Sequence, residues 1–174
     1  RELFGREGGI CSGKGGSMHI ADFDVGMLGA NGIVGAGILI AVGAAKSKKM
    51  LGTNDIVVCF FGDGAVNRGP FLEGLNWARV FNLPVLFVCE DNKYAATTRT
   101  EQLTGGSGPA VRAESLGIPA KIADGNDVIS LDALVGGLVE DIRGGGGPLF
   151  LHVETYRHIG HTVVDPATYR PEAE

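Results

Sequence analysis

The sequence has few cysteines, little excess of basic charge and no long hydrophobic run. Its three cysteines, Cys11, Cys59 and Cys89, form no CxxC pair, so we expect no disulfide and no cysteine-based metal site, and we expect Cys59 and Cys89 to be buried core thiols. The net charge of −5 argues against nucleic acid as the main partner, because phosphate contacts need a basic surface. The longest apolar stretch, residues 35–45, is short and broken by glycines, which excludes a membrane span, and no signal peptide is visible.

Two common nucleotide-binding motifs are also missing. Residues 8–14 have the spacing GxxxxGK of a phosphate-binding P-loop, but a P-loop continues with Ser or Thr and follows a strand. Here Gly15 follows and no strand is expected before it. The stretch GANGIVGAG, residues 29–37, does not fit GxGxxG. We therefore expect neither ATP nor NAD as the ligand.

What the sequence does contain is an alternation of helical and strand patterns. Residues 1–33 are irregular and rich in glycine. After them, short runs of apolar residues predict strands, and apolar residues at helical spacing predict helices between the strands. The strands are expected at 56–61 (buried on both faces), 84–89, 118–123 and 148–155, and the helices at 34–50, 69–82, 109–117 and 131–143. This alternation predicts a doubly wound α/β fold with a parallel sheet, in a single domain of residues 1–174.

Polar residues follow three of these strands. Asp63, Asn92 and His161 each come after the carboxyl end of a different strand, where open parallel sheets bind ligands. Carboxylate and amide oxygens are ligands for a hard cation, and the N-terminus of a helix that starts near Asn67 favours an anion. A divalent metal with a diphosphate fits both features. Alternatively, Asp63 is only a helix cap and Asn92 only a turn residue.

The spacing of these residues leads to a resemblance that covers essentially the whole chain. GDG at 62–64 precedes Asn92 by about thirty residues, as in the thiamine diphosphate signature. Together with CSGKGGSMHI (11–20), NGIVGAG (31–37), LPVLFVCEDNKYA (83–95) and TYRHIGHTVVDPATYR (155–170), the chain resembles the α subunit of the E1 component of 2-oxo acid dehydrogenases and acetoin dehydrogenases. The resemblance implies a thiamine diphosphate-binding fold of the PP-type domain. It also implies decarboxylation of a 2-oxo acid (pyruvate or branched-chain type), or cleavage of acetoin, with acyl transfer to a lipoyl group.

The resemblance also implies the ligands of a magnesium ion and of the cofactor diphosphate. The side chains of Asp63 and Asn92 and the backbone carbonyl of Tyr94 would bind Mg²⁺. The backbone amides of Gly64 and Ala65 would face the diphosphate.

Other site residues follow from the same resemblance. Gly32 and Val34 would line the aminopyrimidine of thiamine diphosphate. His161 would lie near the diphosphate and the reacting carbon as the catalytic residue, steadying charge or relaying protons. His19 is a weaker candidate of the same kind. The chain departs from the family at Ile159, where a second basic residue is common, and at Ala95, where glycine is frequent.

The resemblance implies partners as well. The family's α subunits extend further at both ends, so we expect the core of a longer subunit. No glutamate here clearly fills the cofactor-activating role, since Glu73 is expected on a helix and Glu90 beside the metal loop. That glutamate is expected from an E1 β subunit in an α2β2 heterotetramer, which would serve a lipoyl-bearing E2 carrier. The expected location is the bacterial cytoplasm, or the mitochondrial or plastid matrix in a eukaryote, with no nucleic acid or membrane as partner.

Two alternatives remain open on the sequence. The chain could be half of another thiamine diphosphate enzyme of the transketolase type, although the TYRHIGHT segment favours the E1 family. It could also be a non-enzymatic magnesium- and phosphate-binding α/β module resembling a receiver domain. Such a module would not respond to thiamine diphosphate.

Overall fold

The fold is a parallel β-sheet covered by helices on both faces. The computed structural model describes residues 1–171. The strands are β1 (Val57–Gly62), β2 (Val85–Asp91), β5 (Ala120–Asp124) and β6 (Leu149–Glu154), and the helices are α1 (Ala36–Leu51), α2 (Gly69–Val80), α3 (Pro109–Ser115) and α4 (Val128–Asp141). The sheet order is β1-β2-β6-β5, and all three pairings are parallel. The doubly wound α/β class is confirmed, and each predicted helix and strand is present within a few residues.

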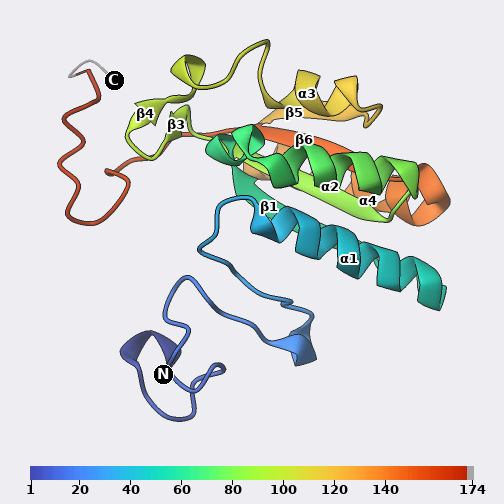
Figure 1. Cartoon of the computed structure of the whole chain (residues 1–174), viewed down its shortest axis with the longest axis horizontal. Helices are drawn as coiled ribbons and strands as arrows, with labels where there is room; N and C mark the ends of the chain where they lie inside the picture. The colour runs from blue at the N-terminus through green and yellow to red at the C-terminus, as the bar shows by residue number, and fades with distance from the viewer. Residues whose placement is uncertain (172–174) are drawn as a thin grey trace.

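Shorter elements occupy the connections between these helices and strands. They are the helical turns η1 (Glu2–Phe4), η2 (Phe23–Val25), η3 (Asp63–Asn67), η4 (Thr100–Gln102) and η5 (Ile142–Gly146), and a hairpin of β3 (Tyr94–Ala95) and β4 (Thr98–Arg99). The sequence did not predict the hairpin, which lies in a twenty-residue polar loop. It lies at the carboxyl edge of the sheet, on the left in Figure 1.

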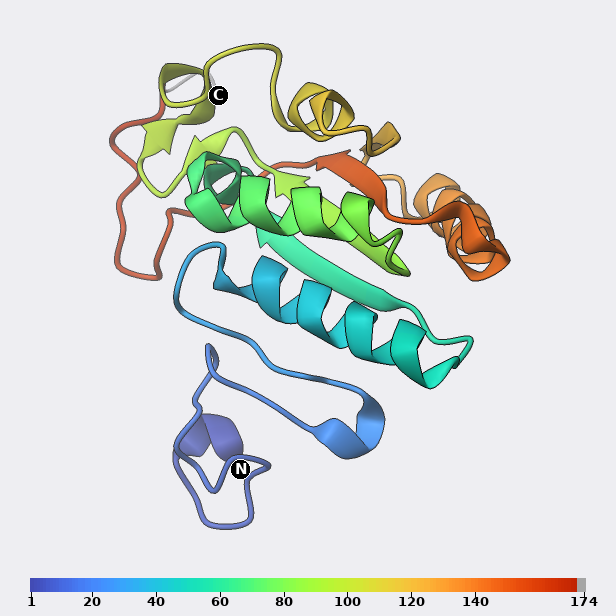
Figure 2. The same cartoon turned by 45° about the vertical axis from the view of Figure 1, so that its right-hand side comes forward.

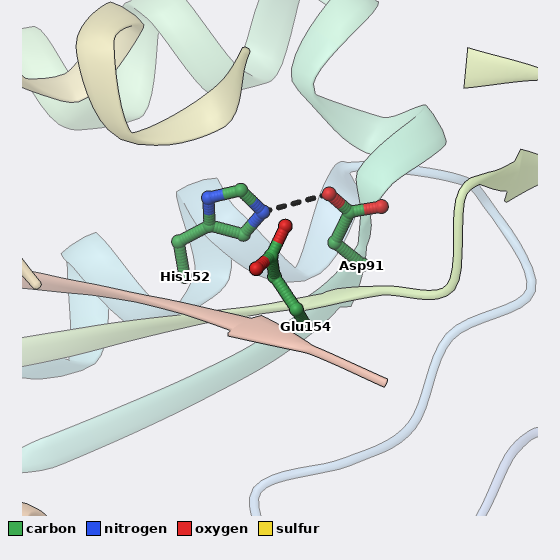
Figure 3. Close-up of side chains that lie close together, drawn as sticks. All are labelled: Asp91, His152 and Glu154. Atoms are coloured by element: carbon green, nitrogen blue, oxygen red, sulfur yellow. Dashed lines mark hydrogen bonds and ion pairs between the residues drawn. The ribbon is translucent and has the colours of Figure 1, made fainter. Parts of the chain in front are cut away.

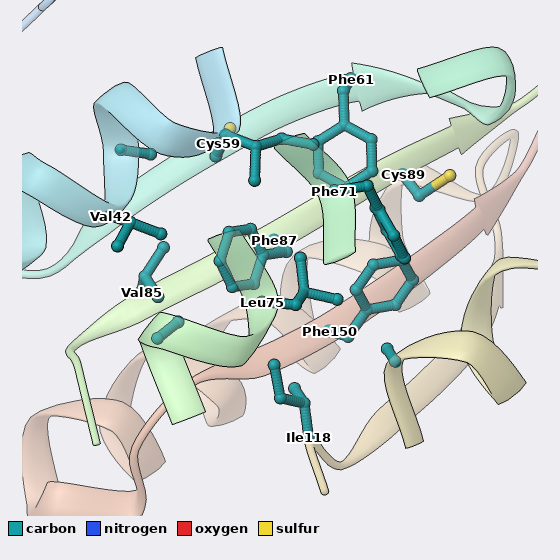
Figure 4. Packing of buried hydrophobic residues seen from close by; sticks show 14 of the residues in the cluster. Val42, Cys59, Phe61, Phe71, Leu75, Val85, Phe87, Cys89, Ile118 and Phe150 are labelled. Atoms are coloured by element: carbon teal, nitrogen blue, oxygen red, sulfur yellow. The ribbon is translucent and has the colours of Figure 1, made fainter. Parts of the chain in front are cut away.

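The main core lies between the sheet and helices α1, α2 and α3. Its centre is aromatic: the ring of Phe61 lies 6.0 Å from that of Phe71 and 6.1 Å from that of Phe150 (Figure 4). Such pairs add to the burial energy of each ring. A second cluster joins α4 to the opposite face of β2 and β6. Two hydrophobic layers therefore fix the edge of the sheet where the strands end.

The expectation that residues 56–61 are buried on both faces is wrong. Val57, Cys59 and Phe61 face the main core, but Val58 is 42% exposed and Phe60 is 66% exposed. The reason is that β1 is an edge strand, while the cluster around α4 takes its strand residues from β2 and β6. Cys59 and Cys89 are buried as predicted, and burial raises the pKa of the Cys59 thiol to about 12.

The first 35 residues lie outside the layers, as both views show (Figures 1 and 2). They contain only short turns and one isolated β-bridge, between Asp22 and Met27, which agrees with the irregular structure predicted for 1–33. No helix within residues 1–171 has the length and apolar character needed to cross a membrane.

Candidate functional site

The residues predicted to bind metal follow two neighbouring strands. β1 pairs with β2 so that Gly62 lies opposite Glu90, and the next residues of both strands therefore leave the sheet at the same edge. The turn at Gly64 packs against the hairpin: a Cβ added at Gly64 would lie 2.8 Å from the Cβ of Ala95. Only glycine fits this approach without a shift. The GDG turn and the segment after β2 are thus in direct contact.

Asp63 is a buried carboxylate with no cationic partner in the described part of the chain. It is 2% exposed, and it forms none of the ion pairs found among residues 1–171. Burial raises its pKa, the hydroxyl of Thr100 donates a hydrogen bond that lowers it, and the charge of Asp91 raises it. A buried carboxylate is stable when a cation or enough hydrogen bonds compensate its charge. A metal ion would supply that charge, so the surroundings of Asp63 fit one.

Asn92 is the second predicted metal ligand and lies in a tight turn after β2. Its Oδ1 accepts the backbone N–H of Tyr94 at 3.1 Å, so the role as a turn residue is present. A carbonyl oxygen has two lone pairs, and one of them remains for a cation. The alternative role of Asp63 as a helix cap does not hold, because Gly62 occupies the N-cap position of η3.

The loop at residues 100–104 and helix α3, to which the sequence analysis gave no role at the site, hold η3 in place. Thr100 reaches Asp63 as described, and the amide of Asn67 donates to the Thr104 hydroxyl at 2.9 Å. The guanidinium of Arg112 donates to the Val66 carbonyl at 2.9 Å and to the Asn67 side chain at 2.8 Å. Thr100 and Arg112 lie 37 and 46 residues from their partners, so no local sequence pattern reveals them.

The sequence analysis also did not identify a polar cluster beside the turn of Asn92. The carboxylate of Asp91 contacts His152 at 2.7 Å (Figure 3). It also contacts the ammonium of Lys93 at 2.8 Å, and Lys93 contacts Glu154 at 2.5 Å. Burial opposes ionisation of Asp91, but the hydrogen bonds from His152 and Lys93 outweigh it and lower the pKa to about 2. A signal was present in the sequence: histidine and acid in the apolar run FLHVE are unusual in a buried strand.

The segment expected to line the cofactor pyrimidine lies at the start of α1. A Cβ on Gly32 would lie 3.1 Å from a ring carbon of His19, and one on Gly35 would lie 3.2 Å from the Cβ of Arg68. The second contact places this segment beside the residue that precedes α2. Val34 is 57% exposed. The roles of Gly32, Val34 and His19 toward a cofactor stay predictions.

The predicted catalytic residue His161 lies in the exposed segment after β6. Its backbone N–H donates to the Asp165 carboxylate at 2.7 Å, and its ring Nδ1 lies 3.5 Å from the guanidinium of Arg157. Arg157 donates to the carbonyl of Ala96 at 2.8 Å and to the hydroxyl of Tyr169 at 2.7 Å. The segment is therefore tied to the β3–β4 turn. Within residues 1–171 no hydrogen bond joins His161 to Asp63 or Asn92, and its role stays a prediction.

The loop with P-loop spacing binds an anion from within the chain. The Glu2 carboxylate accepts the backbone N–H groups of Cys11 at 2.9 Å, Gly13 at 2.9 Å and Gly15 at 2.6 Å. Glycine-rich backbone is suited to such an anion nest. The loop follows the turn η1 rather than a strand, which agrees with the exclusion of a P-loop.

Comparison with known proteins gives one consistent result. The chain is 47% identical over 173 residues to the α subunit of acetoin:2,6-dichlorophenolindophenol oxidoreductase of Bacillus subtilis, which covers 99% of this chain and 52% of the relative. It is 45% identical to the subunit of the same name in Cupriavidus necator, over 100% of this chain and 52% of the relative. It is 39% identical to the pyruvate dehydrogenase E1 component subunit alpha of Rhizobium meliloti, over 99% of this chain and 50% of the relative.

The chain thus spans about half the length of these relatives. The family model described as "Dehydrogenase E1 component" matches residues 1–174. Members of that family generally use thiamine diphosphate and magnesium, which agrees with the lack of a counter-charge at Asp63. The chain belongs to the dehydrogenase E1 component family.

Proposed function

We propose that this chain is the cofactor-binding core of an E1 α subunit that uses thiamine diphosphate and Mg²⁺. The observation that carries the proposal is the buried, cation-free carboxylate of Asp63 beside the turn of Asn92. The side chains of Asp63 and Asn92 and the carbonyl of Tyr94 would hold Mg²⁺, an all-oxygen set of the kind Mg²⁺ prefers. The amides of Gly64 and Ala65, at the start of η3, would hold the diphosphate.

The remaining roles concern the organic part of the cofactor and the reaction. Gly32 and Val34 would line the aminopyrimidine, and His161 would steady charge or carry a proton near the reacting carbon. Thiamine diphosphate supplies a carbon nucleophile and an electron sink for cleaving the bond next to a carbonyl. The protein's part is to orient this group and exclude water.

The names of the relatives support a substrate class for this chain. Of the three named, the two acetoin oxidoreductase subunits share 47% and 45% identity and the pyruvate dehydrogenase subunit shares 39%. Acetoin is therefore the first candidate substrate, and a 2-oxo acid such as pyruvate is the second. The acyl group would pass to a lipoyl-bearing E2 carrier.

The proposed assembly includes a β subunit. The relatives are named as α subunits, which supports a β partner, and we propose an α2β2 heterotetramer. The partner would supply the carboxylate that activates the cofactor, because Glu73 on α2 and Glu90 at the end of β2 are both exposed. The named relatives are bacterial, which supports a location in the bacterial cytoplasm.

Calorimetry of thiamine diphosphate, with and without Mg²⁺, tests the proposal on the chain combined with its β partner. We expect binding that needs both metal and partner. Asp63→Ala should weaken it by more than about 100-fold, beyond the typical effect of an outer-shell contact. Glu90→Gln is the matched control, because this carboxylate lies at the same edge but is exposed, and it should bind as the native chain does. Normal binding by Asp63→Ala, or binding of Mg²⁺ without any response to thiamine diphosphate, would contradict the proposal.

A further inference from the structure

Asp91 is a buried carboxylate that forms hydrogen bonds within the turn that contains Asn92. Only 4% of Asp91 is exposed. Its Oδ1 accepts the backbone N–H of Lys93 at 2.9 Å, and its Oδ2 lies 2.8 Å from the Lys93 ammonium. One carboxylate thus holds Lys93 by both backbone and side chain. The residue enclosed between these contacts is Asn92.

The backbone of this turn needs such support. Lys93 has a φ of 67°, a left-handed conformation that is unfavourable for a residue with a Cβ. The carbonyl of Lys93 accepts the backbone N–H of Thr100 at 2.9 Å, and the hydroxyl of Thr100 donates to Asp63. A chain of contacts therefore runs from Asp91 through Lys93 and Thr100 to Asp63. It connects the two side chains proposed to bind metal.

The turn is anchored to an inner strand of the sheet. His152 is 6% exposed, and its Nε2 lies 2.7 Å from Oδ2 of Asp91. Glu154 lies 2.5 Å from the ammonium of Lys93, and Figure 3 shows both β6 side chains on the side of Asp91. β6 is paired on both sides, with β2 and with β5. Its side chains therefore give the turn a rigid support.

A second metal site is the alternative role for this cluster. Asp91, His152 and Glu154 place one ligand atom each within 4.8 Å of the others. However, the Lys93 ammonium already contacts two of the three side chains. The cluster contains its own cation, which favours a positioning role.

We propose that Asp91, held by Lys93 and His152, is the positioning residue that fixes Asn92 and Asp63 relative to each other for magnesium binding. This inference rests on the proposed function, because it assigns a positioning residue to the same metal site. It concerns contacts outside the ligand set, whose loss typically changes metal affinity about 10–100-fold.

Calorimetric titration of thiamine diphosphate across a series of Mg²⁺ concentrations tests it, on the chain combined with its β partner. Asp91→Ala should raise the Mg²⁺ concentration for half-maximal binding by about 10–100-fold. The double variant Asp91→Ala/Lys93→Gly should recover part of this loss, because glycine adopts the left-handed conformation without penalty, although the contacts with His152 and Glu154 stay lost. A complete absence of recovery by the glycine would overturn the positioning role.

Asp124→Ala is the matched control. Asp124 lies at the carboxyl end of β5 and accepts the N–H of Asn126 at 2.8 Å. Within residues 1–171 no hydrogen bond or ion pair joins Asp124 to residues 91–93, so the Mg²⁺ requirement should stay unchanged. If the native assembly does not bind thiamine diphosphate, the proposed function fails and the inference fails with it. If the native assembly binds and Asp91→Ala has the same Mg²⁺ requirement, only the inference is overturned.

A second variant covers the case in which Asp91→Ala does not assemble. His152→Leu keeps the contacts between Asp91 and Lys93 and removes the contact of Asp91 with β6, while the contact between Lys93 and Glu154 stays. It should also raise the Mg²⁺ requirement. An unchanged requirement in His152→Leu would overturn the inference.

Discussion

The three buried carboxylates among residues 1–171 are compensated in different ways. Asp63 has a hydroxyl and no cation, Asp91 has a histidine and an ammonium, and Glu2 has three backbone amides. Only the first leaves a charge for a ligand to neutralise. The comparison explains why Asp63 fits a metal site, whereas Asp91 and Glu2 serve the structure.

Glu2 gives a prediction with a defined pH dependence. Burial opposes its ionisation, but the amides of Gly13, Cys11 and Gly15 bind the charged form and lower its pKa below the ordinary 4.5. Because the folded pKa is lowered, its contribution to stability is full above about 4.5 and is lost as pH falls through the folded value. Hydrogen exchange of residues 9–16, corrected for intrinsic rates, should therefore accelerate on acidification.

The variant Glu2→Gln separates this effect from general acid unfolding. At neutral pH it should raise the exchange of residues 9–16 by about an order of magnitude, and the acid-dependent step should disappear. Glu7→Gln is the control, because Glu7 is exposed. Equal protection in Glu2→Gln and the native chain would show that the carboxylate does not hold the loop.

At the scale of elements, β1 offers a matched pair of phenylalanines on opposite faces. Phe61 packs against Phe71 and Phe150, whereas its neighbour Phe60 is 66% exposed. Phe61→Ala should lower the free energy of unfolding by about 3–5 kcal/mol, and Phe60→Ala by less than about 1 kcal/mol. Urea denaturation of both variants measures the difference. Equal losses would mean that the second face of β1 is covered in solution.

The sequence predicted the positions of helices and strands along the chain better than it predicted which strands lie side by side in the sheet. Apolar periodicity located the main helices and strands, because a run such as PVLFVC has few other uses in a soluble chain. It did not show that β6 lies beside β2, and so it missed the contact between Asp91 and His152. Apolar periodicity also led to the wrong prediction that β1 is buried on both faces, because a run of apolar residues does not reveal which strand lies at the edge of the sheet. The β3–β4 hairpin has two residues per strand, too few for a pattern.

At the candidate site, too, some residues could be predicted from the sequence and others could not. Asp63 and Asn92 were predictable from the rule that ligands bind at the carboxyl ends of parallel strands, since each follows a run of apolar residues. Thr100 and Arg112 were not, because they act across 37 and 46 residues of chain. A single sequence carries no sign of such distant contacts.

At the scale of the whole molecule, the stretch before α1 differs from the layered part. Of residues 1–34, only Glu2 is buried, so little apolar burial holds this segment, and its local stability should be low. In contrast, two lysines of α1 contact Phe81. The ammonium of Lys46 lies 4.0 Å above the ring of Phe81, and that of Lys49 lies 2.7 Å from the Phe81 carbonyl. Limited trypsin digestion should therefore cut after Arg6 and Lys14 before it cuts within α1.

The same digestion tests whether the stretch before α1 belongs to the site. In the proposed function, Gly32 and Val34 contact the cofactor, and Gly35 already lies against Arg68 beside the start of α2. Ligand that binds only the ordered form stabilises it by mass action. Adding thiamine diphosphate and Mg²⁺ to the assembly with the β partner should therefore slow cleavage after Arg6 and Lys14, whereas thiamine diphosphate without metal should not. Cleavage that is equally fast in the loaded assembly would mean that residues 1–35 take no part in holding the cofactor.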